Sequence, residues 1–346
     1  MNLDIALLLG QDGLTNGAIY ALLAIALVLV YAVTRIVFIP QGEFVAYAAL
    51  TLAEFQYGRV PPTIWLMVVL GLLAASAQIW SSRRQLSLRS LVRSCIVYIA
   101  IPWMVAGVSL WLAPMRPPLL VQIALTMAIV TSLGPSIYRL VFAPVASASV
   151  LLLLIISVAL NFALSGIGLL MFGAEGVRTE AVTSQSFEIG VLTITGQSLW
   201  VIAASGAAMA GLYAFFRLTI YGKALRATAV NRIGAKLLGI RSEIAGGIVL
   251  TFAVGLGAAC GVLIAPLTTI YYDSGFLIGL KGFVAAIIGG LVSYPAAAAG
   301  AILVGLLESF SSFWASAFKE VIVFTLIVPV LLWRSLHTLV IEGDEE

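Results

Sequence analysis

The chain has 346 residues, of which 62% are hydrophobic and only 10% are charged, and its mean hydropathy is +1.13. Because a soluble domain carries about 25% charged residues, so few charges cannot cover a water-facing surface, and most of this surface must face lipid. The net charge of +3 and the shortage of charged residues also exclude the basic, charge-rich surface of a nucleic-acid-binding protein.

Long unbroken apolar runs predict an all-α polytopic membrane protein. A helix that crosses about 30 Å of hydrocarbon needs about 20 mostly apolar residues, whereas a barrel shows strands of about ten alternating residues. The segments 43–57 and 276–291 are short enough to be broken or re-entrant, and residues 1–346 are expected to form one transmembrane domain. In chain order we expect about eleven transmembrane or re-entrant helices, at 14–34, 43–57, 62–80, 94–113, 119–138, 150–172, 199–220, 244–270, 276–291, 296–313 and 320–335.

The Lys and Arg residues set the expected orientation, because cytoplasmic loops carry an excess of positive charge. The loop that contains Arg83 and Arg84 is taken as cytoplasmic. This orientation predicts a periplasmic N-terminus and a cytoplasmic C-terminus. Residues Met1–Asp4 lack the basic region of a signal peptide, so the first apolar run is expected to be retained as a helix. Helix alternation then leaves five of the 18 basic residues outside, namely Arg59, Arg116, Arg178, Lys281 and Lys319.

Two loops are long enough to carry a function of their own. Residues 173–198 are expected on the periplasmic side, where alternating residues over 186–195 predict a small β-hairpin. Residues 221–243 are expected on the cytoplasmic side and are basic. Within this second loop, small residues, helix-forming residues and Gly239 predict a short helix that ends at the glycine.

Few residues carry metal or nucleophile chemistry. Cys95 and Cys260 lie inside apolar runs, as small buried hydrophobic residues do. The single histidine, His337, cannot form a histidine-based metal cluster or dyad. The sequence contains no P-loop and no glycine-rich dinucleotide motif. We therefore expect no catalytic residue, no metal, no cofactor and no ATP hydrolysis in this chain.

The basic loop 221–243 has two interpretations. In the first, its alanine-rich face lets another protein approach closely, with Arg226, Arg232 and Lys236 paired to an acidic rim. In the second, it is a solvated positive loop that only sets the topology. The spacing of the residues alone leaves both open.

Loop 221–243 resembles the cytoplasmic loop of the branched-chain amino acid ABC importer permeases, in which G-x-A-x-R-A-x-A-x-N precedes a short helix and a Gly-Ile. Residues 16–22, 41–44 and 138–145 are also similar to that family, and 281–290 matches its K-x-F-x-A-x-x-x-G-G pattern. The residues of the loop that match are Gly222, Ala224, Arg226, Ala227, Ala229, Asn231, Ala235, Gly239 and Ile240.

The resemblance implies the permease subunit of a binding-protein-dependent ABC importer in the bacterial inner membrane. Such a subunit forms the translocation path for a small polar solute, here branched-chain or related amino acids. The implied partners are a second permease subunit, homologous or identical, two cytoplasmic ATPase subunits that bind ATP-Mg, and a periplasmic substrate-binding protein. The loop 221–243 would be the coupling helix that docks on an ATPase. The implied coupling residues are Arg226, Ala227, Asn231, Arg232, Ala235, Gly239 and Ile240.

A second set of residues is expected to line the pathway or to act as a gate. Pro40 interrupts helical regularity, and backbone groups freed at membrane depth must meet protein or a cavity. For Glu43 the alternative is a helix-capping turn, and for the glycines it is tight helix packing. Glu308, an intramembrane carboxyl group, is either a functional residue or a hydrogen-bonded structural one. The candidates are Gln41, Gly42, Glu43, Lys281, Phe283, Gly289 and Gly290.

Two features depart from the family pattern. Phe38-Ile39-Pro40 stands where the family has Asn-Phe-Ala, which removes a polar side chain from the expected pathway. Residues 81–118 look inserted and are expected to add one helical hairpin outside the pathway.

Two other function classes make different demands on the sequence. An ion- or proton-coupled carrier or channel would require paired intramembrane charges or inverted repeats around broken helices, and the charges here are few. A membrane-embedded enzyme acting on lipid would require clustered His, Asp or Cys residues, and the single histidine argues against such an enzyme.

Overall fold

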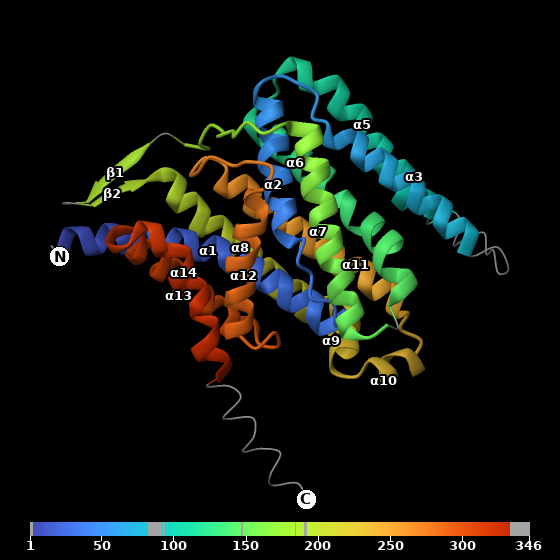
Figure 1. The fold of residues 1–346 in the computed structure, drawn as a ribbon. Helices are drawn as coiled ribbons and strands as arrows, with labels where there is room; N and C mark the ends of the chain where they lie inside the picture. The colour runs from blue at the N-terminus through green and yellow to red at the C-terminus, as the bar shows by residue number, and fades with distance from the viewer. Residues whose placement is uncertain are drawn as a thin grey trace, which may run out of the picture.

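A computed structural model describes residues 3–81, 92, 94–146, 148–183, 185–189 and 192–332 of the chain. This part is a bundle of α-helices with one two-stranded hairpin, so the predicted all-α class is confirmed (Figure 1). Two π-helical turns, Ile96–Ala100 and Tyr138–Phe142, adjoin α5 and α6. The elements are α1 (Leu3–Thr34), α2 (Gln41–Gln56), α3 (Thr63–Ser81), α5 (Ile101–Leu112), α6 (Leu119–Ile137), α7 (Val150–Phe172), β1 (Ser186–Ile189), β2 (Leu192–Thr195), α8 (Gly196–Leu218), α9 (Ile220–Val230), α10 (Arg232–Leu237), α11 (Ser242–Ile264), α12 (Ser274–Ile288), α13 (Tyr294–Trp314) and α14 (Lys319–Thr325).

Each predicted apolar segment contains a helix, as far as the chain is described. Eight helices of the described residues are long and apolar enough to cross a membrane, whereas α2 and α12, with 16 and 15 residues, are shorter, as expected. Two boundaries were predicted wrongly. Helix α1 begins at Leu3 rather than near residue 14, because hydropathy detects the apolar part of a helix and not its polar extension. Helix α11 ends at Ile264 rather than near residue 270.

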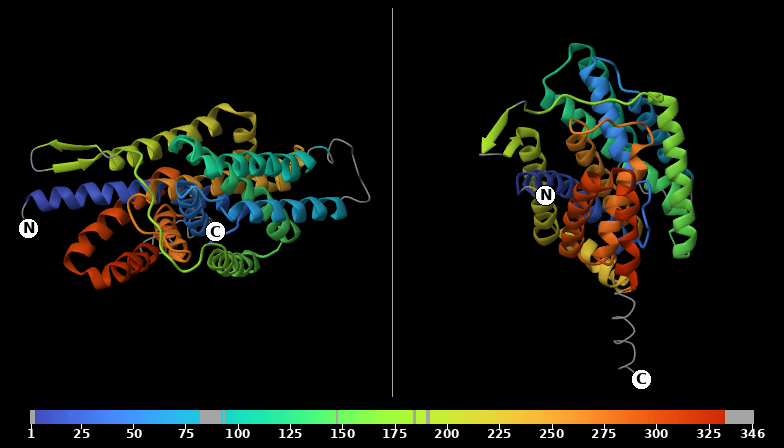
Figure 2. Two further views of the ribbon diagram at one scale, coloured as in Figure 1. Left: turned by 90° about the horizontal axis from the view of Figure 1, so that it is seen from above. Right: turned by 60° about the vertical axis from the view of Figure 1, so that its left-hand side comes forward.

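The predicted hairpin over 186–195 is confirmed, with Ser186 opposite Thr195. It lies beside the N-terminal part of α1 (Figures 1 and 2). In the predicted insertion 81–118, the described residues contain one long helix, Ile96–Met115, which packs on α3 and α6, and the hairpin itself stays a prediction. Whether this segment is an insertion stays a prediction.

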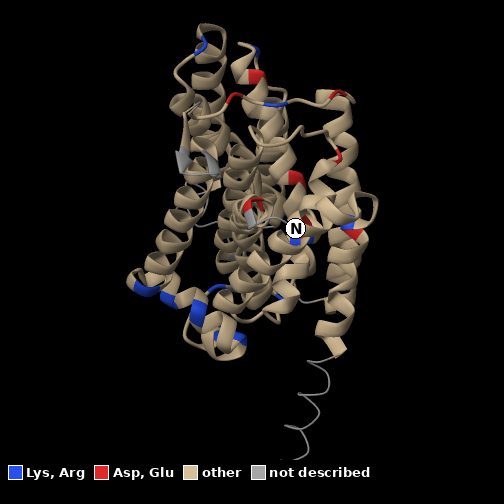
Figure 3. Cartoon of the chain, turned by 90° about the vertical axis from the view of Figure 1, so that its left-hand side faces the viewer, with Lys and Arg blue, Asp and Glu red and all other residues tan. Residues whose placement is uncertain are grey.

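Lys and Arg residues gather at one end of the bundle, which we call the basic end (Figure 3). Helices α9 and α10 lie there. Arg232 Nη2 donates a hydrogen bond to the Ala146 carbonyl oxygen (3.3 Å), which places α10 beside the segment that follows α6. The end of α1 also contacts α9 (Figure 1).

The other end of the bundle, called here the opposite end, is held together by bonds between connecting segments. Arg178 Nε donates to the Pro266 carbonyl oxygen (2.9 Å), and the Glu180 backbone N–H donates to Gln56 Oε1 (2.8 Å). The end of α2 and the segments after α7 and α11 therefore lie together.

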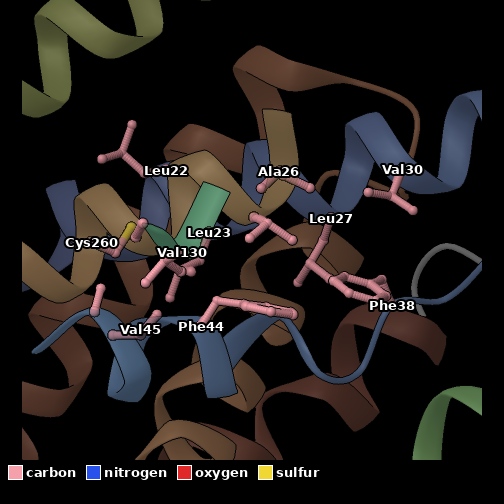
Figure 4. Close-up of a cluster of buried hydrophobic side chains, with 14 of the residues drawn as sticks. Leu22, Leu23, Ala26, Leu27, Val30, Phe38, Phe44, Val45, Val130 and Cys260 are labelled. Atoms are coloured by element: carbon pink, nitrogen blue, oxygen red, sulfur yellow. The ribbon is translucent and has the colours of Figure 1, made fainter. Parts of the chain in front are cut away.

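The core is built around α1 and α2. Helix α2 is buried on nearly all sides, as expected for a helix that is apolar all round. The ring of Phe38, just before α2, stacks on that of Phe44, with their centroids 5.9 Å apart. Val130 of α6 and Cys260 of α11 complete this cluster (Figure 4). The connection between α1 and α2 is thus interior, not a surface loop.

Helix α2 begins inside the bundle. The Ile39 backbone N–H donates to Ser157 Oγ within α7 (3.0 Å), and Gln41 Nε2 donates to the Ala253 carbonyl oxygen, halfway along α11 (2.7 Å). From there α2 rises to the opposite end at Gln56. Its 16 residues span about 24 Å, less than the hydrocarbon thickness. Helix α2 therefore covers only part of a crossing.

Helix α12 begins beside the start of α2. A Cβ atom on Gly42 would collide with the Gly275 carbonyl oxygen and the Gly279 nitrogen, so the two backbones are in direct contact. Helix α12 leads to the basic end, where the Tyr294 ring at the start of α13 stacks on Phe216 of α8. Two half-helices thus meet at their N-termini and run to opposite ends of the bundle.

Candidate functional site

The segment between α8 and α11 folds as two short, well-capped helices at the basic end. Thr219 caps α9, since its Oγ1 accepts a hydrogen bond from the Gly222 N–H (2.9 Å). Asn231 caps α10, since its Oδ1 accepts one from the Gly234 N–H (2.8 Å). Both residues are preferred N-caps, so the sequence itself sets where each helix starts.

The predicted short helix that ends at Gly239 is confirmed. Gly239 has a φ of 84°, the left-handed conformation that favours glycine. The Ile240 N–H turns back to donate to the Ala235 carbonyl oxygen (3.0 Å). Gly239 and Ile240 therefore fix the end of α10.

Large apolar side chains project from this segment, although they lie at the end of the bundle where charge gathers. Val230, Ile233, Leu237 and Leu238 each expose between 77% and 89% of their surface; we call these four residues the apolar knob. An exposed apolar patch rimmed by polar residues marks a contact site. Sequence reasoning missed them, because an apolar residue in a hydrophobic chain shows no sign that it is exposed.

The seven coupling candidates are brought to this one end, in different roles. Arg226 and Ala227 are exposed on α9. Asn231 is a cap, and Arg232 holds α10 to the segment after α6. Ala235 corrects the prediction: it was expected to face a partner, but it is 4% exposed and packs inside the chain.

Gln41 and Glu43 lie at the junction of the two half-helices, and neither exposes any surface. Among the described residues, Gln41 Oε1 and both Glu43 carboxyl oxygens have no hydrogen-bond partner. An unsatisfied buried polar group costs about 1–3 kcal/mol. Glu43 makes no capping bond, so the alternative of a helix-capping turn is not what the structure shows.

Lys281 was expected on the outer side, and that placement is wrong. It lies within α12, is 6% exposed, and its Nζ is 2.5 Å from Glu308 Oε1 of α13. The Tyr20 hydroxyl of α1 donates to Glu308 Oε2 (2.6 Å). Lys281, Glu308 and Tyr20 therefore tie three helices together, so Glu308 is a hydrogen-bonded structural group.

Gly289 and Gly290 make the turn from α12 to α13. A Cβ atom on Gly289 would lie 2.5 Å from the Ala297 nitrogen, and Gly290 has a φ of 69°. Phe283 is half-buried against the core. Close packing and turn geometry account for the two glycines, as the packing alternative for them expected. A pathway role for Phe283, Gly289 and Gly290 stays a prediction.

Comparison with known proteins gives consistent matches. The family described as "Branched-chain amino acid transport system / permease component" matches residues 104–331. The LivH high-affinity branched-chain amino acid transport permeases of Salmonella typhimurium and Escherichia coli K12 are each 26% identical, covering 93% of this chain and 91% of the relative. The high-affinity branched-chain amino acid transport permease BraD of Pseudomonas aeruginosa is 26% identical to this chain, and the match covers 93% of this chain and 92% of BraD. No solved structure matches the chain.

The apolar bundle with charge gathered at one end defines a multi-pass membrane protein. The chain belongs to the permease family of branched-chain amino acid transport systems. Members of this family are transport subunits rather than enzymes. The half-helices and the buried Lys281–Glu308 pair are features expected of a secondary carrier, and the family match assigns them instead to a permease.

Proposed function

We propose that the chain pairs with a second permease subunit, homologous or identical, to form the translocation path of a binding-protein-dependent ABC importer in the bacterial inner membrane. The solute is a branched-chain or related amino acid, delivered by a periplasmic substrate-binding protein. Two cytoplasmic ATPase subunits bind ATP-Mg, and the segment α9–α10 transmits their movement to the bundle. The names of the relatives support the solute class.

The apolar knob carries this proposal. Four large apolar side chains exposed at the basic end would be costly in water, and this end lies away from the hydrocarbon because Lys223, Arg226 and Lys236 are exposed there too. A partner surface with an apolar cleft would bury the four apolar side chains, and an acidic rim around that cleft would pair with the three cations. The ATPase implied by the family is such a partner.

Leu237→Asp combined with Leu238→Asp is expected to weaken ATPase binding at least roughly tenfold, since each buried leucine contributes about 1.5–3 kcal/mol. Co-purification of the ATPase and uptake in proteoliposomes both measure the loss. Met115→Asp is the matched control, because Met115 is 60% exposed at the opposite end. Normal ATPase binding by the double variant would contradict the docking role.

We also propose that the junction of α2 and α12 is the gate. Two half-helices that meet end to end can separate without breaking a continuous helix, and Glu43 and Gln41 would then meet the solute or water. The unpartnered oxygens of these two residues support this, because an unsatisfied buried group in a native structure needs an explanation. Gly42 permits the close approach.

We propose that the basic end is cytoplasmic, which puts the N-terminus in the periplasm and the C-terminus in the cytoplasm. With Cys95→Ser and Cys260→Ala as background, Asn2→Cys is expected to react with an impermeant maleimide in intact cells. Asp344→Cys is expected to react only after permeabilisation. Labelling of both positions from the same side would refute this orientation.

A further inference from the structure

A cavity of about 1740 Å³ lies at the basic end, away from the half-helix junction. Its walls are the C-terminal part of α6, the N-terminal part of α11, helix α10, and the π-helical turn Ile96–Ala100 that precedes α5. It therefore separates the α3–α5 pair, which extends to one side of the bundle (Figures 1 and 2), from α11.

The rim of the cavity is cationic. Arg139, Arg232, Lys236 and Arg241 line it, and the described lining residues include no acidic side chain. Lys236 and Arg241 are exposed, and Arg232 is half-buried with one bond to a backbone carbonyl. The rim therefore favours a ligand with negative charge.

The deeper wall of the cavity is mostly apolar. Val97, Ile101 and Ile248 line it further from the end of the bundle, together with the polar residues Tyr98 and Thr131. The hydroxyls of Ser132 and Thr251 also lie there, but each donates to its own helix backbone at 2.7 Å, so they offer little to a ligand. Polarity thus falls from the rim inward along α6 and α11.

Both π-helical turns of the described chain contribute to this cavity. Val97 and Tyr98 come from Ile96–Ala100, and Tyr138 and Arg139 come from Tyr138–Phe142. A π-helical turn is a rare interruption of an α-helix that occurs frequently at functional sites. Two such turns lining one cavity indicate that the cavity is a functional site.

We propose that this cavity binds an anionic phospholipid, with the phosphate at the cationic rim and an acyl chain along the apolar wall. A soluble anion would match the rim alone, and the remaining apolar volume would stay unfilled. A second copy of this chain would bring a like-charged surface to the rim, which is unfavourable. A phospholipid has the same polarity gradient as the cavity, and basic pockets between membrane helices at the cytoplasmic side suit its head group.

The test uses the full chain purified in detergent, with phosphatidylglycerol as the probe and phosphatidylcholine as the neutral comparison. Phosphatidylglycerol is expected to raise the midpoint of thermal unfolding and to be retained in native mass spectra, and phosphatidylcholine is not. Lys236→Gln combined with Arg241→Gln is expected to weaken retention roughly thirtyfold. Lys223→Gln combined with Arg217→Gln is the matched control, because both residues are exposed near this end but lie outside the cavity lining.

Ile248→Trp separates a lipid from a soluble anion, because it fills the apolar wall and leaves every cation in place. Loss of phosphatidylglycerol binding in this variant supports the proposal. Glycerol phosphate that binds as tightly as the lipid and survives Ile248→Trp would overturn it. Equal retention of the two lipids, or a disulfide between two copies through Ile248→Cys, would also overturn it.

Discussion

Replacing Lys281 by methionine is expected to lower the free energy of unfolding by about 3–5 kcal/mol, because it leaves a buried carboxyl group without its cation. Glu308 would keep only the hydrogen bond from Tyr20, and its side chain is 12% exposed, so water compensates little. Methionine has a similar length and stays compatible with α12. Denaturant unfolding of the purified chain in detergent measures the change.

The double variant Lys281→Met with Glu308→Leu is the control for this result. It removes both charges and is expected to recover most of the lost stability, since an apolar pair often replaces a buried ion pair at little cost. Tyr20→Phe should lower stability by about 1.5–3 kcal/mol, as expected for one hydrogen bond to a charged group. If the effects of the Lys281 and Glu308 substitutions simply add, the two residues are not coupled.

The positions of the helices could be predicted from the sequence because lipid leaves few choices. A long apolar run must satisfy its own backbone in hydrocarbon, and a helix does so within one segment. The same reasoning found α2 and α12 as short segments, and glycine chemistry found the end of α10 at Gly239. These features depend on residues that are close in the chain.

The site could not be predicted in the same way, because it depends on contacts between distant residues. The alternation rule placed Lys281 outside because it assumes that every helix crosses, whereas α12 starts partway along the bundle, beside the start of α2. Its partner Glu308 is 27 residues away and Tyr20 is 288 residues from Glu308. Hydropathy also cannot distinguish a lipid-facing leucine from Leu237, which projects from the basic end.

The two half-helices α2 and α12 carry two segments that are far apart in the sequence. Residues 41–44 and 281–290 each resembled a family motif, and the structure places the helices that carry them end to end. The N-terminal ends of both helices carry positive dipole charge. The Glu43 carboxyl group lies at this junction with no hydrogen-bond partner among the described residues, which suits a residue that changes its contacts as the gate opens.

Glu43→Met is expected to raise stability and lower uptake together. The substitution removes two buried oxygens that have no partner among the described residues, so the free energy of unfolding should rise by about 1–3 kcal/mol. Uptake should fall because an apolar side chain at the junction favours the closed contact between α2 and α12 and offers nothing polar when they separate.

Thr51→Val is the matched control, since Thr51 is buried on the same helix but shares a 2.9 Å hydrogen bond with Thr63. Removing that bond leaves Thr63 without its partner, so this variant should lose stability by about 1 kcal/mol while it keeps its uptake. The two variants are compared by thermal unfolding in detergent and by amino acid uptake into proteoliposomes that contain the assembled complex. Unchanged uptake in Glu43→Met would show that the gate does not lie at this junction. A loss of stability in the same variant would instead mean that Glu43 has a structural partner, and that its burial serves the fold rather than the transport cycle.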